Sequence, residues 1–185
     1  MPPAVSEIVT PRLKLLPMTL RAVLAAQQNE AALATCLQKR CVEGCLDPSF
    51  TRVLTDLAAC LAADPSLAAW NRWVVKLAAD PAEEAVIGTI GFLTRPDDLG
   101  VVELGYSIAP PEQNLGYATE AARGLIGFAF SQRSVRTVAA MCREDNPASM
   151  KVLEKTGFVR VEELGPMWAW ELNRATYEAQ QRDKK

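Results

Sequence analysis

Residues 111–121 connect an expected strand to an expected helix and include the small residues Gly116 and Ala118. The strand is expected to end at Ile108 and the helix to begin near Gly116, with Ala118 in its first turn. Small residues there leave backbone N–H groups accessible at a helix N-terminus, where the helix dipole favours an anion. The segment therefore predicts a phosphate or diphosphate site. It has neither the G-K-[ST] of a Walker A loop nor the three glycines of a dinucleotide fingerprint. The alternative is that Gly116 only caps the helix and Ala118 only packs.

Glu103 is an acidic residue within a largely apolar expected strand. It lies on the expected strand Val101–Ile108, where alternation puts it on one face with Gly105 and Ser107, and puts Leu104, Tyr106 and Ile108 on the other. A carboxylate among apolar neighbours has a raised pKa, which suits a base working near neutral pH. A glutamate that is salt-bridged or exposed at a sheet edge is the competing interpretation.

Asn146 and Ser149 begin the next expected helix, Pro147–Thr156. Asn before Pro is an N-cap followed by proline at the first helical position, and a hydroxyl in the first turn is common. Both residues therefore have a purely structural interpretation, and a ligand-binding role for either needs further support.

The chain contains no histidine among its 185 residues. This excludes Ser/His/Asp and Cys/His catalytic groups and any histidine-ligated metal site. The net charge of −2 gives no basic field for nucleic acid. Five cysteines without a C-x-x-C pair suggest reduced thiols and no metal. Neither a signal peptide nor a membrane span is visible, so we expect a cytoplasmic protein without a membrane partner.

The periodicity predicts a single α/β (α+β) domain over residues 1–175, with a solvated tail over 176–185. We expect an early strand over Ile8–Pro17 with Pro11 at a sheet edge. Helices dominate residues 20–63, and one of them is marked by Leu54, Leu57, Ala58 and Leu61. The later elements are expected as strands over 73–77, 86–93, 101–108, 137–141, 158–161 and 168–172, and as helices over 116–130 and 147–156.

The string ELGYSIAPPEQNLGYATEA, residues 103–121, resembles the acetyl-CoA-binding segment of the GNAT N-acetyltransferase superfamily. The family signature is (Gln/Arg)-x-x-Gly-x-(Gly/Ala), matched here by Gln113, Gly116 and Ala118. The segments Thr10–Leu13, Ile87–Gly91 and Asn146–Phe158 extend the resemblance over most of the chain. Together they resemble the RimJ/RimL branch, whose members acetylate protein N-terminal amines, while relatives acetylate small amines.

The resemblance implies a mixed, mostly antiparallel sheet of about six to seven strands, splayed between the fourth and fifth and flanked by helices. It implies acetyl-CoA as cosubstrate and no metal. The backbone near Ile108 would bond the pantetheine, Asn146 would contact the coenzyme arm, and Ser149 would lie near the thioester sulfur. Glu103 matches a catalytic Glu of some members. The turn that holds the pyrophosphate would be formed by Gln113, Asn114, Leu115, Gly116, Tyr117, Ala118 and Thr119.

The function predicted on this basis is direct acetyl transfer to a primary amine, either a protein N-terminus or a small molecule, by a monomer or homodimer. Lys155 could meet a coenzyme phosphate or simply face solvent. One position departs from the family pattern: the helical Tyr that often protonates the thiolate is replaced by Leu153. An acyl-CoA-binding module without turnover is therefore the alternative function.

Overall fold

A computed structural model describes residues 7–48, 52–77 and 84–182. Its chain begins with a hairpin of β1 (Ile8–Val9) and β2 (Leu13–Pro17), joined by a turn in which the Thr10 N–H donates to the Leu13 carbonyl at 2.9 Å. Our expectation of one strand over Ile8–Pro17 is corrected here. Pro11 lies in the turn, where its lack of an N–H costs nothing, and not at the edge of a strand.

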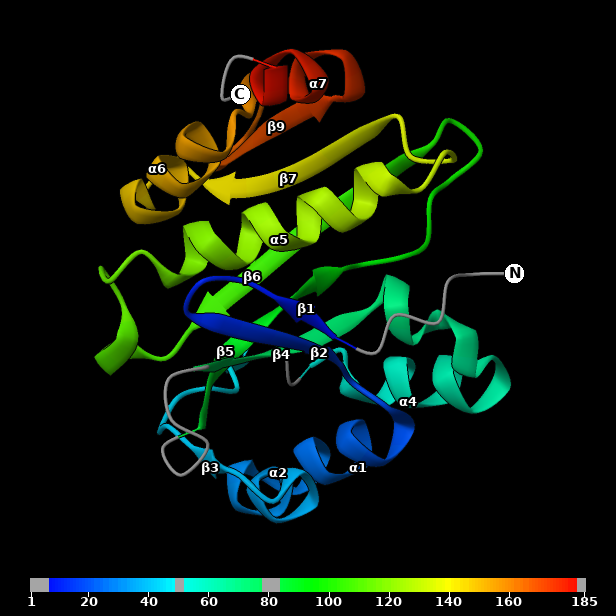
Figure 1. The fold of residues 1–185 in the computed structure, drawn as a ribbon, viewed down its shortest axis with the longest axis vertical. Helices are drawn as coiled ribbons and strands as arrows, with labels where there is room; N and C mark the ends of the chain where they lie inside the picture. The colour runs from blue at the N-terminus through cyan, green and yellow to red at the C-terminus, as the bar shows by residue number, and fades with distance from the viewer. Residues whose placement is uncertain (1–6, 49–51, 78–83, 183–185) are drawn as a thin grey trace.

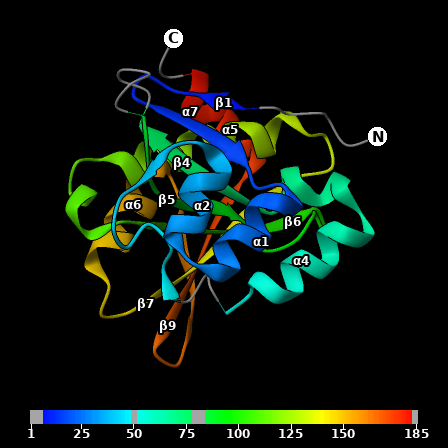
Figure 2. The ribbon, with the colours of Figure 1, turned by 90° about the horizontal axis from the view of Figure 1, so that it is seen from below.

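The helices α1 (Leu20–Gln28), α2 (Glu30–Leu37) and α4 (Leu54–Ala63) gather at one end of the molecule (Figures 1 and 2). Thr19 caps α1 by accepting from the Ala22 N–H at 3.3 Å, as its position before the helix predicts. The buried face of α4 consists of the four residues that the periodicity selected, Leu54, Leu57, Ala58 and Leu61. A 3-10 helix, η1 (Pro65–Trp70), leads from α4 into the sheet.

The central sheet has the strand order β1-β2-β4-β5-β6-β7-β9-β8, with β3 (Arg40–Cys41) beside β5. Among the described residues, only the β3–β5 and β6–β7 pairs are parallel. The mixed, mostly antiparallel fold is therefore confirmed, and the strand number exceeds the expected six to seven because β1 and β3 are two-residue strands. The remaining strands are β4 (Arg72–Leu77), β5 (Ala85–Phe92), β6 (Val101–Ile108), β7 (Thr137–Arg143), β8 (Val159–Leu164) and β9 (Met167–Asn173).

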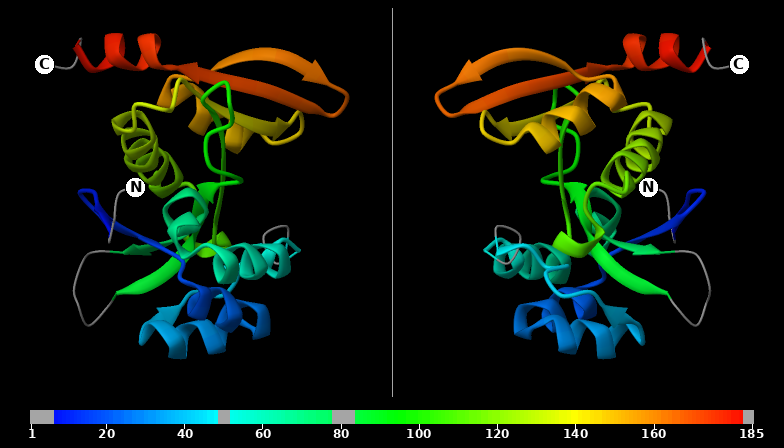
Figure 3. Two further views of the ribbon diagram at one scale, coloured as in Figure 1. Left: turned by 90° about the vertical axis from the view of Figure 1, so that its right-hand side faces the viewer. Right: turned by 90° about the vertical axis from the view of Figure 1, so that its left-hand side faces the viewer.

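Helix α5 (Tyr117–Ser131) crosses one face of the sheet and follows the short 3-10 helix η2 (Pro110–Glu112) (Figure 1). Helix α6 (Pro147–Thr156), the β8–β9 hairpin and α7 (Arg174–Arg182) lie at the end of the molecule opposite α1 and α2 (Figure 3). Because α5 follows β6 and α6 follows β7, both helices begin after the carboxyl ends of these two strands.

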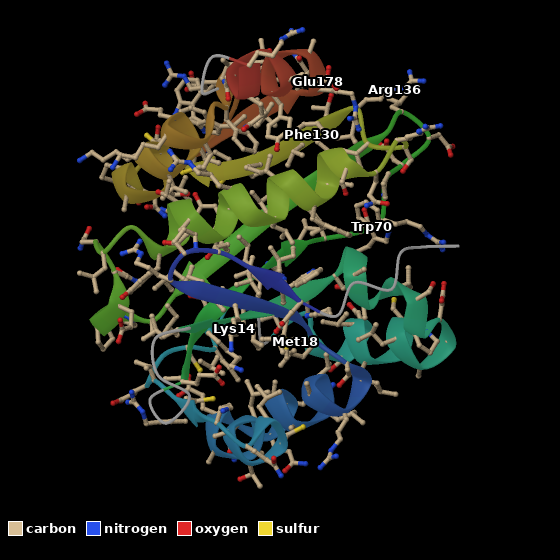
Figure 4. All side chains as sticks on the ribbon, in the orientation of Figure 1. Lys14, Met18, Trp70, Phe130, Arg136 and Glu178 are labelled. Carbon is tan, nitrogen blue, oxygen red and sulfur yellow. The ribbon has the colours of Figure 1, made fainter. Side chains whose placement is uncertain are left out.

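Helix α7 stands where we expected a solvated tail from residue 176. The Tyr177 ring stacks on Phe130 with centroids 4.6 Å apart, and Arg174 donates to the carbonyls of Phe130, Gln132 and Val135. Figure 4 shows Phe130 at the end of α5 below the helix that carries Glu178. These contacts attach the first turn of α7 to the domain through an aromatic ring and an arginine.

One continuous hydrophobic core joins the sheet to its helices. Its aromatic centre lies where β4, β5 and α5 meet, with Trp70 5.6 Å from Phe92 and 5.4 Å from Phe128 between ring centroids. Trp73 is fully buried, and its indole N–H donates to the Ala69 carbonyl at 3.2 Å. The core thus fixes β4 and β5 as the rigid support on which β6 rests.

A cluster of charged side chains lies at the other end of β4 and β5. The buried Glu84 carboxylate contacts the Nζ atoms of Lys14 at 2.8 Å, Lys39 at 2.7 Å and Lys76 at 3.0 Å. Lys14 is labelled on β2 in Figure 4. Hydrogen bonds from these three lysines hold the pKa of Glu84 far below its usual range. The cluster joins β2, β4 and β5 with the chain that follows α2.

No helix within the described residues is both long and apolar enough to cross a bilayer.

Candidate active site

Strands β6 and β7 pair only at their beginnings. The parallel register runs through Val101–Thr137 and Val102–Val138 and ends at Glu103–Ala139. Beyond that point β6 continues to pair with β5, and β7 continues to pair with β9. The splay expected between the fourth and fifth main strands is therefore present, and the facing edges of Leu104–Ile108 and Ala140–Arg143 diverge.

A cavity of about 240 Å³ occupies this opening. Asn146 and Ser149 of the predicted site line it, together with a stretch of β6, the diverging part of β7 and one residue of β4. Its lining consists of Arg72, Thr89, Leu104, Gly105, Tyr106, Ser107, Ala140, Met141, Cys142, Arg143, Asn146, Ser149, Leu153 and Met167. Two strand edges facing a cavity can accept an extended ligand in the manner of an added strand.

The backbone of Ile108 points toward the open side of β6. Since the next residue, Ala109, donates its N–H to the Ile87 carbonyl on β5 at 2.8 Å, the groups of Ile108 face the other way. The Ile108 carbonyl accepts from Gln113 Nε2 at 2.8 Å. This contact anchors the turn before α5 to the end of β6.

The turn before α5 presents backbone to solvent. Asn114 and Gly116 both adopt left-handed conformations, with φ of +61° and +83°, and Gly116 is the N-cap without a side-chain hydrogen bond to the helix. A Cβ on Gly116 would lie 3.4 Å from Arg12 Nη2. The amides of Leu115 to Thr119 thus lie at the N-terminus of α5, where the helix dipole favours an anion.

Arg12 reaches this turn from the β1–β2 hairpin, and it was not among the predicted site residues. Its Nη1 donates to the Leu115 carbonyl at 3.0 Å, its Nε contacts Glu120 Oε2 at 2.7 Å, and its guanidinium lies 4.6 Å from the centre of the Tyr117 ring. Partial burial favours a higher pKa for Glu120, but hydrogen bonds from Thr10 and Arg12 lower that pKa overall. Arg12 therefore offsets the negative charge of Glu120 in the first turn of α5.

Helix α6 presents Asn146 and Ser149 to the cavity. The Asn146 side chain caps the helix by accepting from the Ser149 N–H at 3.0 Å, as the Asn-Pro signal predicts. The Ser149 hydroxyl oxygen lies 2.8 Å from Tyr106 Oη. Leu153, one turn further along, is buried and lines the same cavity. Lys155 lies at the far end of α6, where its carbonyl accepts from Arg123 Nη2 at 3.0 Å.

Glu103 is the last residue of β6 that pairs with β7, and it comes immediately before the residues that line the cavity. Burial raises its pKa, and the charge of Arg72 partly offsets that rise. Arg72 reaches β6 from β4 by crossing Gly91, and its Nη1 donates to the Gly105 carbonyl at 3.1 Å. A Cβ on Gly105 would lie 3.1 Å from Arg72 Nη1, so glycine keeps this path open. The carboxyl group thus has the raised pKa expected from its sequence context.

The model of the acetyltransferase (GNAT) domain family matches residues 12–159, which is well over half of the chain. The chain belongs to the GNAT acetyltransferase family. In this GNAT chain the matched region begins at Arg12 and includes the opening between β6 and β7, the turn before α5 and all of α6.

Relatives and solved structures agree with the family. The chain is 40% identical over 74 residues to an uncharacterized N-acetyltransferase, YjdG, of Bacillus subtilis, a match covering 40% of this chain and 44% of that protein. The match thus spans less than half of the relative. RimJ of Mycobacterium smegmatis, solved with CoA-disulfide, shares the fold with a TM-score of 0.65 at 17% identity, over 100% of this chain and 98% of that one. The aminoglycoside acetyltransferase AAC(6')-Ib, solved with coenzyme A, gives a TM-score of 0.62 at 17% identity, over 91% and 99% of the two chains.

Within the described part of this GNAT chain, no group of three or more Cys, Asp or Glu residues is arranged to hold a metal ion. The polar groups near the opening come from Glu103, Tyr106, Ser149 and Arg72, and those near the turn come from backbone amides. Glu103 precedes the stretch Leu104–Ile108, Tyr106 lies within it, and the turn before α5 follows it.

Proposed function

We propose that this chain is an acetyl-CoA-dependent N-acetyltransferase that moves the acetyl group directly to a primary amine. The observation that carries the proposal is the early end of the β6–β7 register at Glu103–Ala139, which opens a cavity beside the N-terminus of α6. The turn before α5 follows at the end of β6. Neighbours of the same fold were solved with CoA-disulfide and with coenzyme A. The RimJ/RimL branch is the subfamily we propose, on the strength of the segment Asn146–Phe158.

The residues present fit such a cosubstrate. The amides of Leu115, Gly116, Tyr117, Ala118 and Thr119 would hold the pyrophosphate, because the left-handed turn at Asn114 and Gly116 leaves them accessible. The backbone of Ile108, on the open edge of β6, would bond the pantetheine arm, and Asn146 would contact it from α6. Lys155 lies away from the cavity and would meet only a phosphate at the outer end of the coenzyme.

Acetyl-CoA supplies the activated acyl group, so the protein has two tasks in addition to positioning. The amine must lose a proton, since an alkylamine with a pKa of about 10 is mostly protonated at neutral pH. Glu103 would take that proton, directly or through water, because its raised pKa suits a base. The sulfur must leave with its bonding electron pair and gain a proton, and Ser149, which lines the cavity, would supply that proton.

The acceptor class is a primary amine, on a protein N-terminus or a small molecule. The test is a free-thiol assay that follows CoA release from acetyl-CoA with a panel of peptides, polyamines, amino acids and aminoglycosides. We expect release well above the rate without acceptor for one class. Tight CoA binding with no release for any class would instead support a binding module without turnover, and absence of CoA binding would overturn both functions.

A further inference from the structure

Tyr106 and Ser149 form a hydroxyl pair across the opening between β6 and α6. Tyr106 Oη lies 2.8 Å from Ser149 Oγ and 3.2 Å from the Ser149 carbonyl oxygen, although the residues are 43 positions apart. Both side chains line the cavity, and both are only partly exposed. The proposed function uses Ser149 and leaves Tyr106 without a role.

The position of the Tyr106 phenol on β6 is informative because α6 contains no tyrosine. Leu153 is the residue of α6 that faces the cavity one turn beyond Ser149, and it is an apolar side chain. Alternation along β6 turns Tyr106 toward α6, away from the face that carries Glu103 and Arg72. A tyrosine hydroxyl therefore enters the cavity from the strand and not from the helix.

The hydrogen bonds around Ser149 leave open only the direction in which its hydroxyl hydrogen points. The Ser149 N–H is bound by the Asn146 side chain at 3.0 Å, which fixes the first turn of α6. The single hydrogen of the Tyr106 phenol can be donated to the Ser149 carbonyl oxygen at 3.2 Å or to Ser149 Oγ at 2.8 Å, and either hydroxyl can donate in the shorter contact. If the phenol donates to Ser149 Oγ, the serine hydrogen is directed away from Tyr106 and into the cavity.

We propose that Tyr106 is a positioning residue for acetyl transfer, whose phenol donates to Ser149 Oγ and so directs the Ser149 hydrogen to the departing thiolate sulfur. The inference rests on the proposed function and deepens it. In the transfer, the amine nitrogen forms the C–N bond and gives one proton to Glu103. The C–S bond breaks with its electron pair on sulfur, which takes the Ser149 proton while Ser149 takes one from water. The hydroxide that remains takes the proton held by Glu103, so that water and the ionised carboxylate are restored.

Tyr106 keeps its own proton throughout this sequence. Burial raises the pKa of Tyr106 to about 12, while the hydrogen bond with Ser149 acts in the opposite direction. The phenol is therefore protonated over the whole pH range in which an amine acetyltransferase works, and it remains a donor to Ser149 Oγ. Its effect on transfer passes through Ser149 alone.

The test is a double-mutant cycle in which kcat is measured for the wild type, Tyr106→Phe, Ser149→Ala and the combined variant. Each kcat is divided by the fraction of that protein preparation that binds CoA. Phe keeps the ring and removes only the hydroxyl. Loss of a neutral hydrogen bond of about 1 kcal/mol lowers kcat about fivefold, whereas loss of a proton donor lowers it about 100-fold. We expect KM for acetyl-CoA to stay within about twofold of wild type, because the pair acts on the leaving group and not on binding.

The combined variant should be no slower than Ser149→Ala, since Tyr106 acts through Ser149. Tyr177→Phe is the matched control, because Tyr177 stacks on Phe130 outside the site and should leave kcat unchanged. A Tyr106→Phe enzyme with wild-type kcat, or effects that multiply in the combined variant, would overturn the inference while leaving the acetyltransferase activity established. A wild-type protein without turnover would overturn the proposed function itself.

Discussion

The two sides of β6 differ in how they are joined to their neighbours. On one side, β5 and β6 pair over five positions, from Gly88–Ile108 to Phe92–Leu104. On the other, β6 and β7 pair over three and then separate. The paired side carries the aromatic core and the Glu84–lysine cluster, and the open side carries Tyr106, Ser149 and the cavity. The same residues, Leu104–Ile108, are thus rigidly supported on one edge and available on the other.

This contrast suggests that stability and activity are largely separate in this fold. Variants on the paired side should lower the free energy of unfolding and leave chemistry intact. Variants on the open side should lower activity and leave the free energy of unfolding near the wild-type value. Crossed effects, with activity lost on the paired side or stability lost on the open side, would break the comparison.

The largest effect is expected for Glu103→Gln, at the point where the open side begins. The variant should lower kcat about 100-fold, because a general base contributes at least that factor, while CoA affinity and thermal stability stay near wild type. The exposed Glu154→Gln on α6 is the matched control and should keep full activity. Steady-state kinetics at neutral pH decide the matter, and full activity in Glu103→Gln would eliminate it as the base.

The pH dependence sharpens the same assignment. A base must be deprotonated, so kcat/KM should be retained above the pKa of Glu103 and lost as the pH falls through it. Because burial raises that pKa, the acidic limb should begin above the ordinary glutamate value of 4.5. A rate profile measured across acidic and neutral pH should show this limb in the wild type, and its persistence in Glu103→Gln would assign it to another group.

On the paired side, Glu84→Gln should lower the free energy of unfolding by about 2 kcal/mol, because hydrogen bonds to charged groups contribute about 1.5–3 kcal/mol and three lysines lose their counter-charge. For a domain of this size that corresponds to a decrease in Tm of about 4–8 °C. The exposed Glu43→Gln is the control. The CoA-release rate at 25 °C should be unchanged in both variants, and a loss of turnover in Glu84→Gln would contradict the separation.

The stability difference should also depend on pH. The folded-state pKa of Glu84 is depressed, so its contribution is present above the unfolded value of about 4.3 and is lost as pH falls below it. Thermal melts of wild type and Glu84→Gln should therefore converge in acid. A constant difference down to strongly acidic pH would mean that the cluster stabilises the fold by packing and not by charge.

The smallest effect is expected at Gly116, in the turn between β6 and α5. Gly116→Val should weaken CoA binding about tenfold, equivalent to about 1.4 kcal/mol, because a branched side chain crowds the anion and resists a positive φ. Gly165→Val is the matched control, since Gly165 also has a positive φ, of +62°, and a Cβ there meets nothing within 4 Å. Calorimetric titration should show weakened binding only for Gly116→Val, and equal Kd values would move the phosphate site elsewhere.

Local signals in the sequence predicted the elements that build the site. Strand β6 and helix α6 have the bounds predicted for them, Val101–Ile108 and Pro147–Thr156, because prolines and an Asn-Pro cap mark their ends. The splay and the family followed from motifs. Whether the predicted site residues bind and react as proposed remains for the experiments above.

Contacts between distant residues were beyond the sequence analysis. Arg12 meets Glu120 across 108 positions and Tyr106 meets Ser149 across 43, and no periodicity records either contact. Pro11 was assigned to a strand edge because a turn and an edge both tolerate a residue without an N–H. Helix α7 was missed because its anchors are tertiary: Tyr177 stacks on Phe130, and Arg174 donates to the carbonyls of Phe130, Gln132 and Val135.

The central claim is that CoA occupies the opening between β6 and β7 and reaches the turn before α5. Hydrogen exchange of the backbone amides, measured with and without saturating CoA, tests it most directly. We predict slower exchange in Leu104–Ile108, Leu115–Thr119 and the facing residues of β7, with β4 and β5 unchanged. Bound CoA that leaves these segments unprotected, or that protects only residues elsewhere, would contradict the account.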